Sequence, residues 1–372
     1  MSMWIQRFMD TITNMFPFSV PSEKAIDFLG IMYCSPSQED DPEGHRIVNE
    51  AFIDDYRTRV WLTYRRNFPS LIDRNECETG IITDSGWGCS VRVTQMLLAQ
   101  SLISLNFTRD WRLSCASESE YRKYVELMSE FMDTPESALS IHSIVKAGHT
   151  LFNKKPSEWF GPTTGAKAAT GIFNSTCSSK LGCCVVTFDS GELYRSEVIT
   201  ALNESPNGVI IFLTHRLGLD SFNEARYKPT IHSLFSCKFF QGLSSGEAMV
   251  SAYYMFACCD DFLYYLDPHT VQDAFLDTSH ISDSLPPQPR PLKMRWSRLN
   301  PSMNMGFTVK SVSELDSLCS FLSKIDPGLF EIVDIRRPFE SLDFTLEKVT
   351  NGGTSETEDA NDDDDDLIII NS

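Results

Sequence analysis

The sequence predicts an α+β fold, and three observations support this class. Aromatic and β-branched segments alternate with helical ones from about residue 47 to residue 338. The chain has 372 residues, of which 42% are hydrophobic, and 25 of them are phenylalanine, so it can fill at least one sizeable core. No run of about eighteen apolar residues occurs, so a membrane-spanning helix is not expected.

The predicted elements follow from hydrophobic spacing. Helices are expected where apolar residues recur at intervals of three and four, in residues 90–105, 119–132, 196–203 and 312–324. Strands are expected in runs rich in aromatic and β-branched residues, at 183–188, 208–213, 251–259 and 262–266. The proline-rich stretch 282–291 predicts an extended surface loop.

Both ends are expected to lie outside the globular core. Residues 1–25 form an amphipathic arm with a helix that Pro17 ends. Three alternatives are open for it: packing on the core, acting as a lid or partner-binding arm, or lying on a membrane. The last is the weakest because Arg7 is its only basic residue before Pro17. Residues 339–372 are predicted to be disordered and acidic, and the aliphatic run 367–370 either adds a strand to a partner or has no role.

Cysteine usage and charge limit the environment and the partners. The eleven cysteines contain no Cys-x-x-Cys pair, which indicates a reduced, cytoplasmic protein without a structural zinc framework. The net charge of −19 repels phosphate backbones, so a nucleic-acid partner is not expected. The adjacent cysteines at 183–184 and 258–259 lie on predicted strands and point to opposite faces. No metal or other cofactor is therefore expected.

A cysteine at the start of the predicted helix 90–105 carries the strongest chemical signal. Residues 83–88 contain two glycines and form a tight turn that brings Cys89 to the first turn of this helix. The unpaired backbone N–H groups and the helix dipole favour a thiolate there, and the same N–H groups can stabilise an oxyanion. The alternative is an unreactive, buried cysteine.

A second segment supplies a partner for this cysteine. The predicted strand 262–266 runs directly into Asp267, Pro268 and His269. Pro268 keeps Asp267 extended, so the side chains of Asp267 and His269 project to the same side. The carboxylate can orient the imidazole there, and a cysteine with an oriented histidine is the minimum for nucleophilic acyl transfer.

These two segments resemble the autophagins, papain-like cysteine proteases that process ubiquitin-like modifiers of autophagy. The resemblance rests on SGWGC at 85–89 and YLDPHTVQ at 265–272, and on four further motifs in the same order: WLTYRRNFP at 61–69, WFGP at 159–162, RLGL at 216–219 and NPSMNMGF at 300–307. It covers about residues 28–335. It implies a papain-like catalytic domain in residues 26–338, with a small inserted auxiliary domain.

The resemblance also implies roles for individual residues. Cys89 is the expected nucleophile, His269 the general base and acid, and Asp267 the carboxylate that orients it. The Tyr64 hydroxyl is expected to stabilise the oxyanion beside the backbone N–H of Cys89, and Trp159 to clamp a narrow substrate tail. Ordinary packed aromatic residues are the alternative for Tyr64 and Trp159.

Two further sites are expected from the same resemblance. A flexible regulatory loop at 241–246 is expected to bind substrate through Gln241, Gly242 and Gly246, although its sequence QGLSSG departs from the family pattern. Phe339 and Leu342 fit a short modifier-binding motif.

The implied function is cleavage after the C-terminal glycine of a ubiquitin-like autophagy modifier of the light-chain-3 or GABA-receptor-associated-protein type. The same reaction would activate the modifier precursor and release the modifier from phosphatidylethanolamine, so membrane contact would occur only through the substrate. A monomer is expected. The alternatives are a non-catalytic adaptor that binds the modifier and a papain-like deubiquitinase with another ubiquitin-like substrate.

Overall fold

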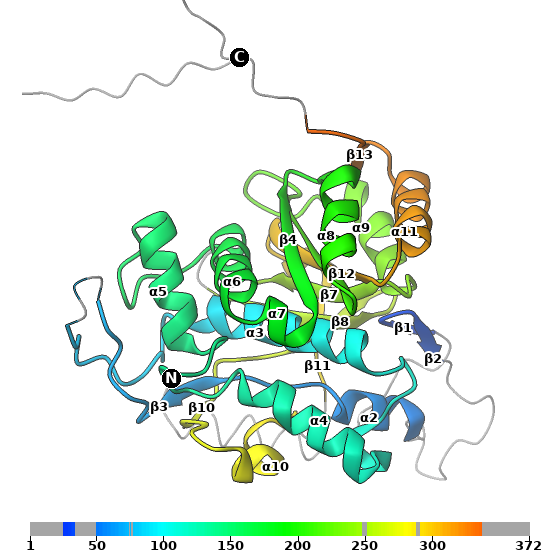
Figure 1. Ribbon diagram of the computed structural model, residues 1–372. Coiled ribbons are helices and arrows are strands. Elements are labelled where there is room, and N and C mark those ends of the chain that lie inside the picture. The colour runs from blue at the N-terminus through cyan, green and yellow to red at the C-terminus, as the bar shows by residue number, and fades with distance from the viewer. Residues whose placement is uncertain are drawn as a thin grey trace, which may run out of the picture. The chain divides into compact units, whose positions relative to one another are not determined.

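A nine-stranded mixed sheet forms the centre of the protein (Figure 1). The computed structural model describes residues 25–33, 50–73, 75, 77–247, 251–287 and 291–336. The strands of the sheet are β1 (Ile26–Phe28), β2 (Ile31–Tyr33), β4 (Cys183–Asp189), β6 (Gly208–Arg216), β7 (Phe240–Ser245), β8 (Tyr253–Cys258), β9 (Phe262–Leu266), β11 (Leu292–Arg295) and β12 (Ser302–Val309).

The strand order in this sheet is β11-β9-β8-β7-β12-β6-β4, and β1 pairs with both β2 and β8. Only β4 and β6 run parallel among these described strands. Two parallel pairs lie outside the sheet: β3 (Tyr64–Arg66) with β10 (Val271–Asp273), and β5 (Glu192–Tyr194) with β13 (Glu331–Val333).

Helices cover both faces of the sheet (Figure 1). They are α2 (Glu50–Arg57), α3 (Cys89–Asn106), α4 (Glu118–Ser129), α5 (Ile141–Phe152), α6 (Pro162–Thr176), α7 (Ser178–Leu181), α8 (Arg195–Glu204), α9 (Glu224–Phe235), α10 (Ile281–Ser284) and α11 (Val312–Ile325). On β7, the Phe240 ring packs edge-on against Phe235 of α9, while Gln241 bonds to Gln100 of α3. The helices α3 and α9 therefore lie on opposite faces of the sheet.

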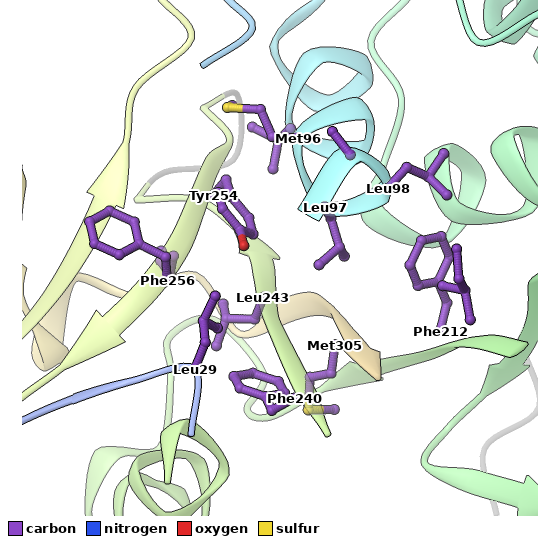
Figure 2. Packing of buried hydrophobic residues seen from close by; sticks show 14 of the residues in the cluster. Leu29, Met96, Leu97, Leu98, Phe212, Phe240, Leu243, Tyr254, Phe256 and Met305 are labelled. Atoms are coloured by element: carbon purple, nitrogen blue, oxygen red, sulfur yellow. The ribbon is translucent and has the colours of Figure 1, made fainter. Parts of the chain in front are cut away.

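The helix α3 is almost wholly buried, including polar residues such as Arg92, Gln95 and Gln100, which bond inside the core. It packs on β7, β8 and β12. Figure 2 shows Met96 and Leu97 of α3 facing the sheet, with Leu243 of β7 and Met305 of β12 beneath them. Burial of this helix fixes the position of its first residue, Cys89.

The predicted class and elements are confirmed. The four predicted helices are α3, α4, α8 and α11, and the four predicted strands are β4, β6, β8 and β9. The extended loop predicted at 282–291 is wrong at its start, because residues 281–284 form α10, where buried Ile281 accepts a hydrogen bond from the backbone of Leu285.

Several predictions concern residues that the structure does not describe. The amphipathic arm, the acidic tail and the Phe339–Leu342 motif lie outside the described residues, except that Ala25 is described. No helix in the described ranges has the length and hydrophobicity needed to cross a membrane.

Candidate active site

A tight turn places Cys89 at the first position of α3. The backbone carbonyl of Asp84 accepts hydrogen bonds from Trp87 N (3.2 Å) and Gly88 N (2.8 Å). Gly88 cannot be replaced without a shift, because an added Cβ would lie 2.6 Å from the Asp84 side chain. The glycine of the SGWGC motif therefore lets the chain pass close to Asp84 just before the cysteine.

Asp267 and His269 lie together after β9. Asp267 Oδ1 lies 2.5 Å from His269 Nδ1 and accepts a hydrogen bond from His269 N at 2.9 Å. Since Nδ1 is held by the carboxylate, Nε2 is the ring nitrogen that remains for the sulfur of Cys89.

Aromatic residues hold the histidine from two sides. The rings of Tyr64 and Tyr253 stand edge-on to the imidazole, with centroids at 5.3 Å and 5.5 Å. Tyr64 N donates to Pro268 O at 2.7 Å, and the indole N–H of Trp61 donates to Asp267 O at 2.7 Å. The segment with the histidine is thus fastened to the strand with Tyr64.

The electrostatics of this group favour a charged pair. Burial raises the pKa of the Cys89 thiol, but the hydrogen bond and positive charge of His269 oppose this effect, and the net pKa is lowered. Tyr64 and Trp159 add to the lowering by donating toward the sulfur. Burial lowers the pKa of His269, but hydrogen bonds and charge at Asp267 and Cys89 raise it to about 9. Both shifts favour a thiolate beside an imidazolium over the neutral thiol and imidazole.

The hydroxyl of Tyr64 stays protonated in the same environment. Burial, followed by the charge and hydrogen bond of Cys89, raises the pKa of this phenol. Tyr64 is therefore a neutral hydrogen-bond donor next to the sulfur, as an oxyanion-stabilising group must be.

A pocket of about 300 Å³ opens beside the cysteine. Its lining includes Ser90, which follows Cys89, and Trp159, Arg216, Gly246 and Asn300. Cys89 itself is 0% exposed, so neighbouring side chains must move before a substrate carbonyl can reach the sulfur.

The residues of the substrate-binding loop expected at 241–246 lie in two different environments, the core and the pocket. The flexible loop predicted here is wrong, because Phe240–Ser245 form the fully buried strand β7. The Gln241 amide bonds to Gln100 and Thr308 inside the core. Gly242 has φ +104°, and an added Cβ would lie 2.6 Å from the carbonyl oxygen of Met255. Gln241 and Gly242 are core residues, whereas Gly246 lines the pocket.

A buried ionic network, which the sequence analysis missed, joins the two halves of the site. Arg92 Nε lies 2.6 Å from Asp84 Oδ2, and its Nη1 lies 2.6 Å from Asp133 Oδ1. Asp84 Oδ1 accepts from Arg65 N, next to Tyr64, and Asp133 Oδ2 accepts from the backbone of Phe275 beyond the histidine. The signal that could have revealed it is an arginine in an otherwise apolar helical run, since a buried arginine needs carboxylate partners.

A cysteine at a helix N-terminus, with a histidine held by a carboxylate, is the arrangement found in cysteine peptidases. Comparison with known proteins leads to the same class. Residues 49–321 match the peptidase C54 catalytic domain. The chain therefore belongs to the peptidase C54 family, the autophagins, with a papain-like α+β fold, and it is a cysteine protease of the autophagy pathway.

Three fungal relatives illustrate the similarity. The probable cysteine protease atg4 of Botryotinia fuckeliana (strain B05.10) is 26% identical over 347 residues, which cover 86% of this chain and 76% of the relative. The probable cysteine protease ATG4 of Pichia angusta is 29% identical over 345 residues, which cover 82% of this chain and 66% of the relative. The cysteine protease ATG4 of Saccharomyces cerevisiae (strain ATCC 204508 / S288c) is 34% identical over 233 residues, which cover 61% of this chain and 45% of the relative.

Proposed function

We propose that this protease cleaves after the C-terminal glycine of a ubiquitin-like autophagy modifier of the light-chain-3 or GABA-receptor-associated-protein type. Cleavage of a peptide bond activates the precursor, and cleavage of the amide to phosphatidylethanolamine releases the modifier from a membrane. Both leaving groups are amines, so one site serves both reactions.

One observation carries this proposal: the pKa of the Cys89 thiol is lowered while that of His269 is raised to about 9. These shifts favour the ionised nucleophile and place the proton that the leaving amine needs on the neighbouring imidazole. Asp267 keeps this proton donor oriented through its 2.5 Å contact with Nδ1.

The first half of the reaction forms an acyl-enzyme. The Cys89 thiolate attacks the glycine carbonyl, and the negative charge moves to the carbonyl oxygen. The backbone N–H of Cys89 and the hydroxyl of Tyr64 are the proposed donors to this oxyanion. As the intermediate collapses, the C–N bond breaks and His269 gives its proton to the departing amine, which leaves a thioester.

The second half of the reaction regenerates the enzyme. The neutral His269 takes a proton from a water molecule, whose oxygen attacks the thioester carbonyl. Collapse of this second intermediate releases the glycine carboxylate and restores the thiolate and the imidazolium. No metal or other co-reactant is needed for this sequence.

The pocket beside Cys89 supports a narrow substrate tail. Trp159 borders it, together with small residues such as Gly161, Ser245 and Gly246. A glycine-ended tail has no side chain to grip, so an indole wall opposite small residues suits its backbone. This fit is the basis for proposing Trp159 and Gly246 as substrate-binding residues.

The test is incubation of the full chain with a light-chain-type modifier that carries a C-terminal extension, followed by intact-mass measurement. The wild type should release the extension directly after glycine, and Cys89→Ala should not. Cys184→Ala, which removes a half-buried thiol on β4, is the matched control and should cleave normally.

Other outcomes would point to other functions. Binding of the modifier without cleavage by any variant would indicate an adaptor. Equal cleavage of ubiquitin conjugates would indicate a deubiquitinase. The lipid reaction needs its own assay, in which vesicles that carry the phosphatidylethanolamine conjugate should lose the modifier to solution only when Cys89 is intact.

A further inference from the structure

A second group of cysteine, histidine and aspartate lies at the opposite end of β8 from the active site. Asp27 belongs to β1, His232 to α9 and Cys258 to β8. One potential ligand atom from each of the three lies within 4.8 Å of the others. Asp27 and Cys258 are direct neighbours in the antiparallel pairing of β1 with β8, so the sheet itself brings them together.

The spacing of these atoms suits a small cation. Asp27 Oδ2 lies 3.7 Å from His232 Nδ1. Ligands bound to zinc at 2.0–2.3 Å in a tetrahedron lie about 3.5 Å from one another. The Asp27–His232 pair therefore needs a movement of only a few tenths of an ångström, while rotation of the Cys258 side chain would have to shorten its distances, which are within 4.8 Å, by up to about 1.3 Å.

The Asp27 carboxylate lacks a strong partner. Its side chain is only 13% exposed, and its one ion pair among the described residues is the contact with His232. At 3.7 Å this contact is too long for a hydrogen bond. A mostly buried carboxylate gains stability from a close cation, and a bound metal ion would supply one here.

The Nδ1 atom of the histidine faces Asp27. Its ring lies against the Trp296 indole, with centroids 6.2 Å apart and planes inclined by 26°. Its Nε2 lies 3.8 Å from Asp260 Oδ1. This distance is also too long for a hydrogen bond, so Asp260 would have to move closer to give the carboxylate support that is usual for a metal-binding histidine.

We propose that Asp27, His232 and Cys258 bind one zinc ion. A thiolate, an imidazole and a carboxylate together favour zinc over magnesium or calcium, which prefer oxygen ligands alone. On binding, the Cys258 thiol loses its proton to solvent and the sulfur coordinates the metal, while water fills the fourth position.

The proposed ion fastens the short strand β1, which lies between β2 and β8, and takes no part in peptide cleavage. The strand β1 has only three residues, and the ion ties it to both β8 and α9. Along β8, Cys258 lies five residues from Tyr253, whose ring contacts His269. Five residues of extended strand span about 17 Å. The inference therefore stands whether or not the proposed substrate is correct.

The test uses the Cys89→Ala chain, because the active site offers zinc the same three residue types. After chelation, dialysis and addition of zinc, elemental analysis of the protein should find one zinc per chain. Asp27→Asn and His232→Ala in this background should each weaken zinc binding at least about tenfold in a titration against a chromogenic chelator. Cys183→Ser, which removes a buried thiol on β4, is the matched control and should retain the zinc.

Cobalt provides a second measurement that reports the sulfur directly. Cobalt bound to the Cys89→Ala chain should show the thiolate charge-transfer band, and Cys258→Ser should remove it. If Cys258→Ser does not fold, His232→Ala still tests the proposal, because the His232 side chain is 27% exposed. Absence of bound zinc in the Cys89→Ala chain, or unchanged affinity in both Asp27→Asn and His232→Ala, would overturn it.

Discussion

The two Cys–His–Asp groups of this protein contain the same residue types, but the pKa of the cysteine is shifted in opposite directions in them. The pKa of the Cys89 thiol is lowered, against the effect of burial, by His269 and its neighbours. The pKa of the Cys258 thiol is raised well above its ordinary value by burial, and the nearby Asp27 raises it further. Only the first cysteine is poised as a nucleophile.

The difference lies in where the histidine nitrogens point. In the active site, Asp267 holds Nδ1 of His269 at 2.5 Å and leaves Nε2 for the sulfur. In the second group, both nitrogens of His232 face carboxylates, at 3.7 Å and 3.8 Å. The thiol of Cys258 instead approaches the backbone carbonyl of His232, at 3.9 Å. Residue types alone therefore do not define a catalytic group, because orientation decides which atom receives the proton.

Removal of the nucleophile should have the largest effect. Cys89→Ala should lower kcat for modifier cleavage by at least about a thousandfold, because no other group can form the thioester. The measurement is intact mass over time at saturating substrate. Retention of more than a tenth of the activity would mean that another residue is the nucleophile.

Loss of the orienting carboxylate should have the next largest effect. Asp267→Asn should reduce kcat by about a thousandfold or somewhat less, because the imidazole loses the partner that holds Nδ1 and stabilises its charge. Circular dichroism of the variant controls for folding. An unchanged kcat would mean that Asp267 is not needed to orient His269.

The Tyr64 hydroxyl should contribute less than the charged pair. Tyr64→Phe keeps the edge-on ring contact with His269 and removes one proposed oxyanion donor, so kcat should fall about a hundredfold with little change in KM. Steady-state kinetics with a fluorogenic modifier substrate measure both constants. A rise in KM alone would assign the residue to substrate binding.

The pH profile should reflect the raised pKa of the histidine. The active pair loses its imidazolium proton as the pH rises through about 9, so kcat/KM should fall roughly tenfold per pH unit above that value. On the acid side, activity should persist below the usual range of thiol pKa values, because the Cys89 thiolate is stabilised. Asp267→Asn should move the alkaline limb to lower pH, and an unmoved limb would contradict this assignment.

The smallest effect on activity is expected in the core strand β7. Gln241→Leu should leave kcat and KM within about twofold, while unfolding in urea should show a loss of about 1–2 kcal/mol, since the amide bonds only to core residues. Gly246→Val, by contrast, should raise KM because Gly246 lines the pocket. A large kinetic effect of Gln241→Leu would restore it as a substrate-binding residue.

Local signals predicted much of the fold and both halves of the candidate site. The helix that begins at Cys89 and the Asp267–His269 pair follow from apolar spacing, a glycine turn and one proline. The strand at Gln241 and Gly242 could not be predicted in this way. Its glycine and serine residues lack the apolar alternation of a strand, and only packing against Tyr254 and Met255 explains why Gly242 is there.

Contacts between distant segments were beyond sequence reasoning. Arg92 meets Asp133 across 41 positions, and Asp27 meets His232 and Cys258 only after the sheet has formed. Of the adjacent cysteines expected on a strand, Cys258 ends β8 and Cys259 lies just beyond it, and an ion shared by Cys258 with residues of other elements was not considered.

The central claim is that the pKa of the Cys89 thiol lies below its ordinary value, whereas that of Cys258 lies above it. The most direct test is an NMR titration of the full chain labelled with ¹³C at cysteine Cβ, with the two signals assigned by Cys89→Ala and Cys258→Ser. The Cys89 signal should titrate below the usual thiol range and shift upward in His269→Ala, while Cys258, in zinc-free protein, should titrate above that range. A Cys89 signal that titrates at or above the ordinary thiol pKa, unaffected by His269→Ala, would contradict the account.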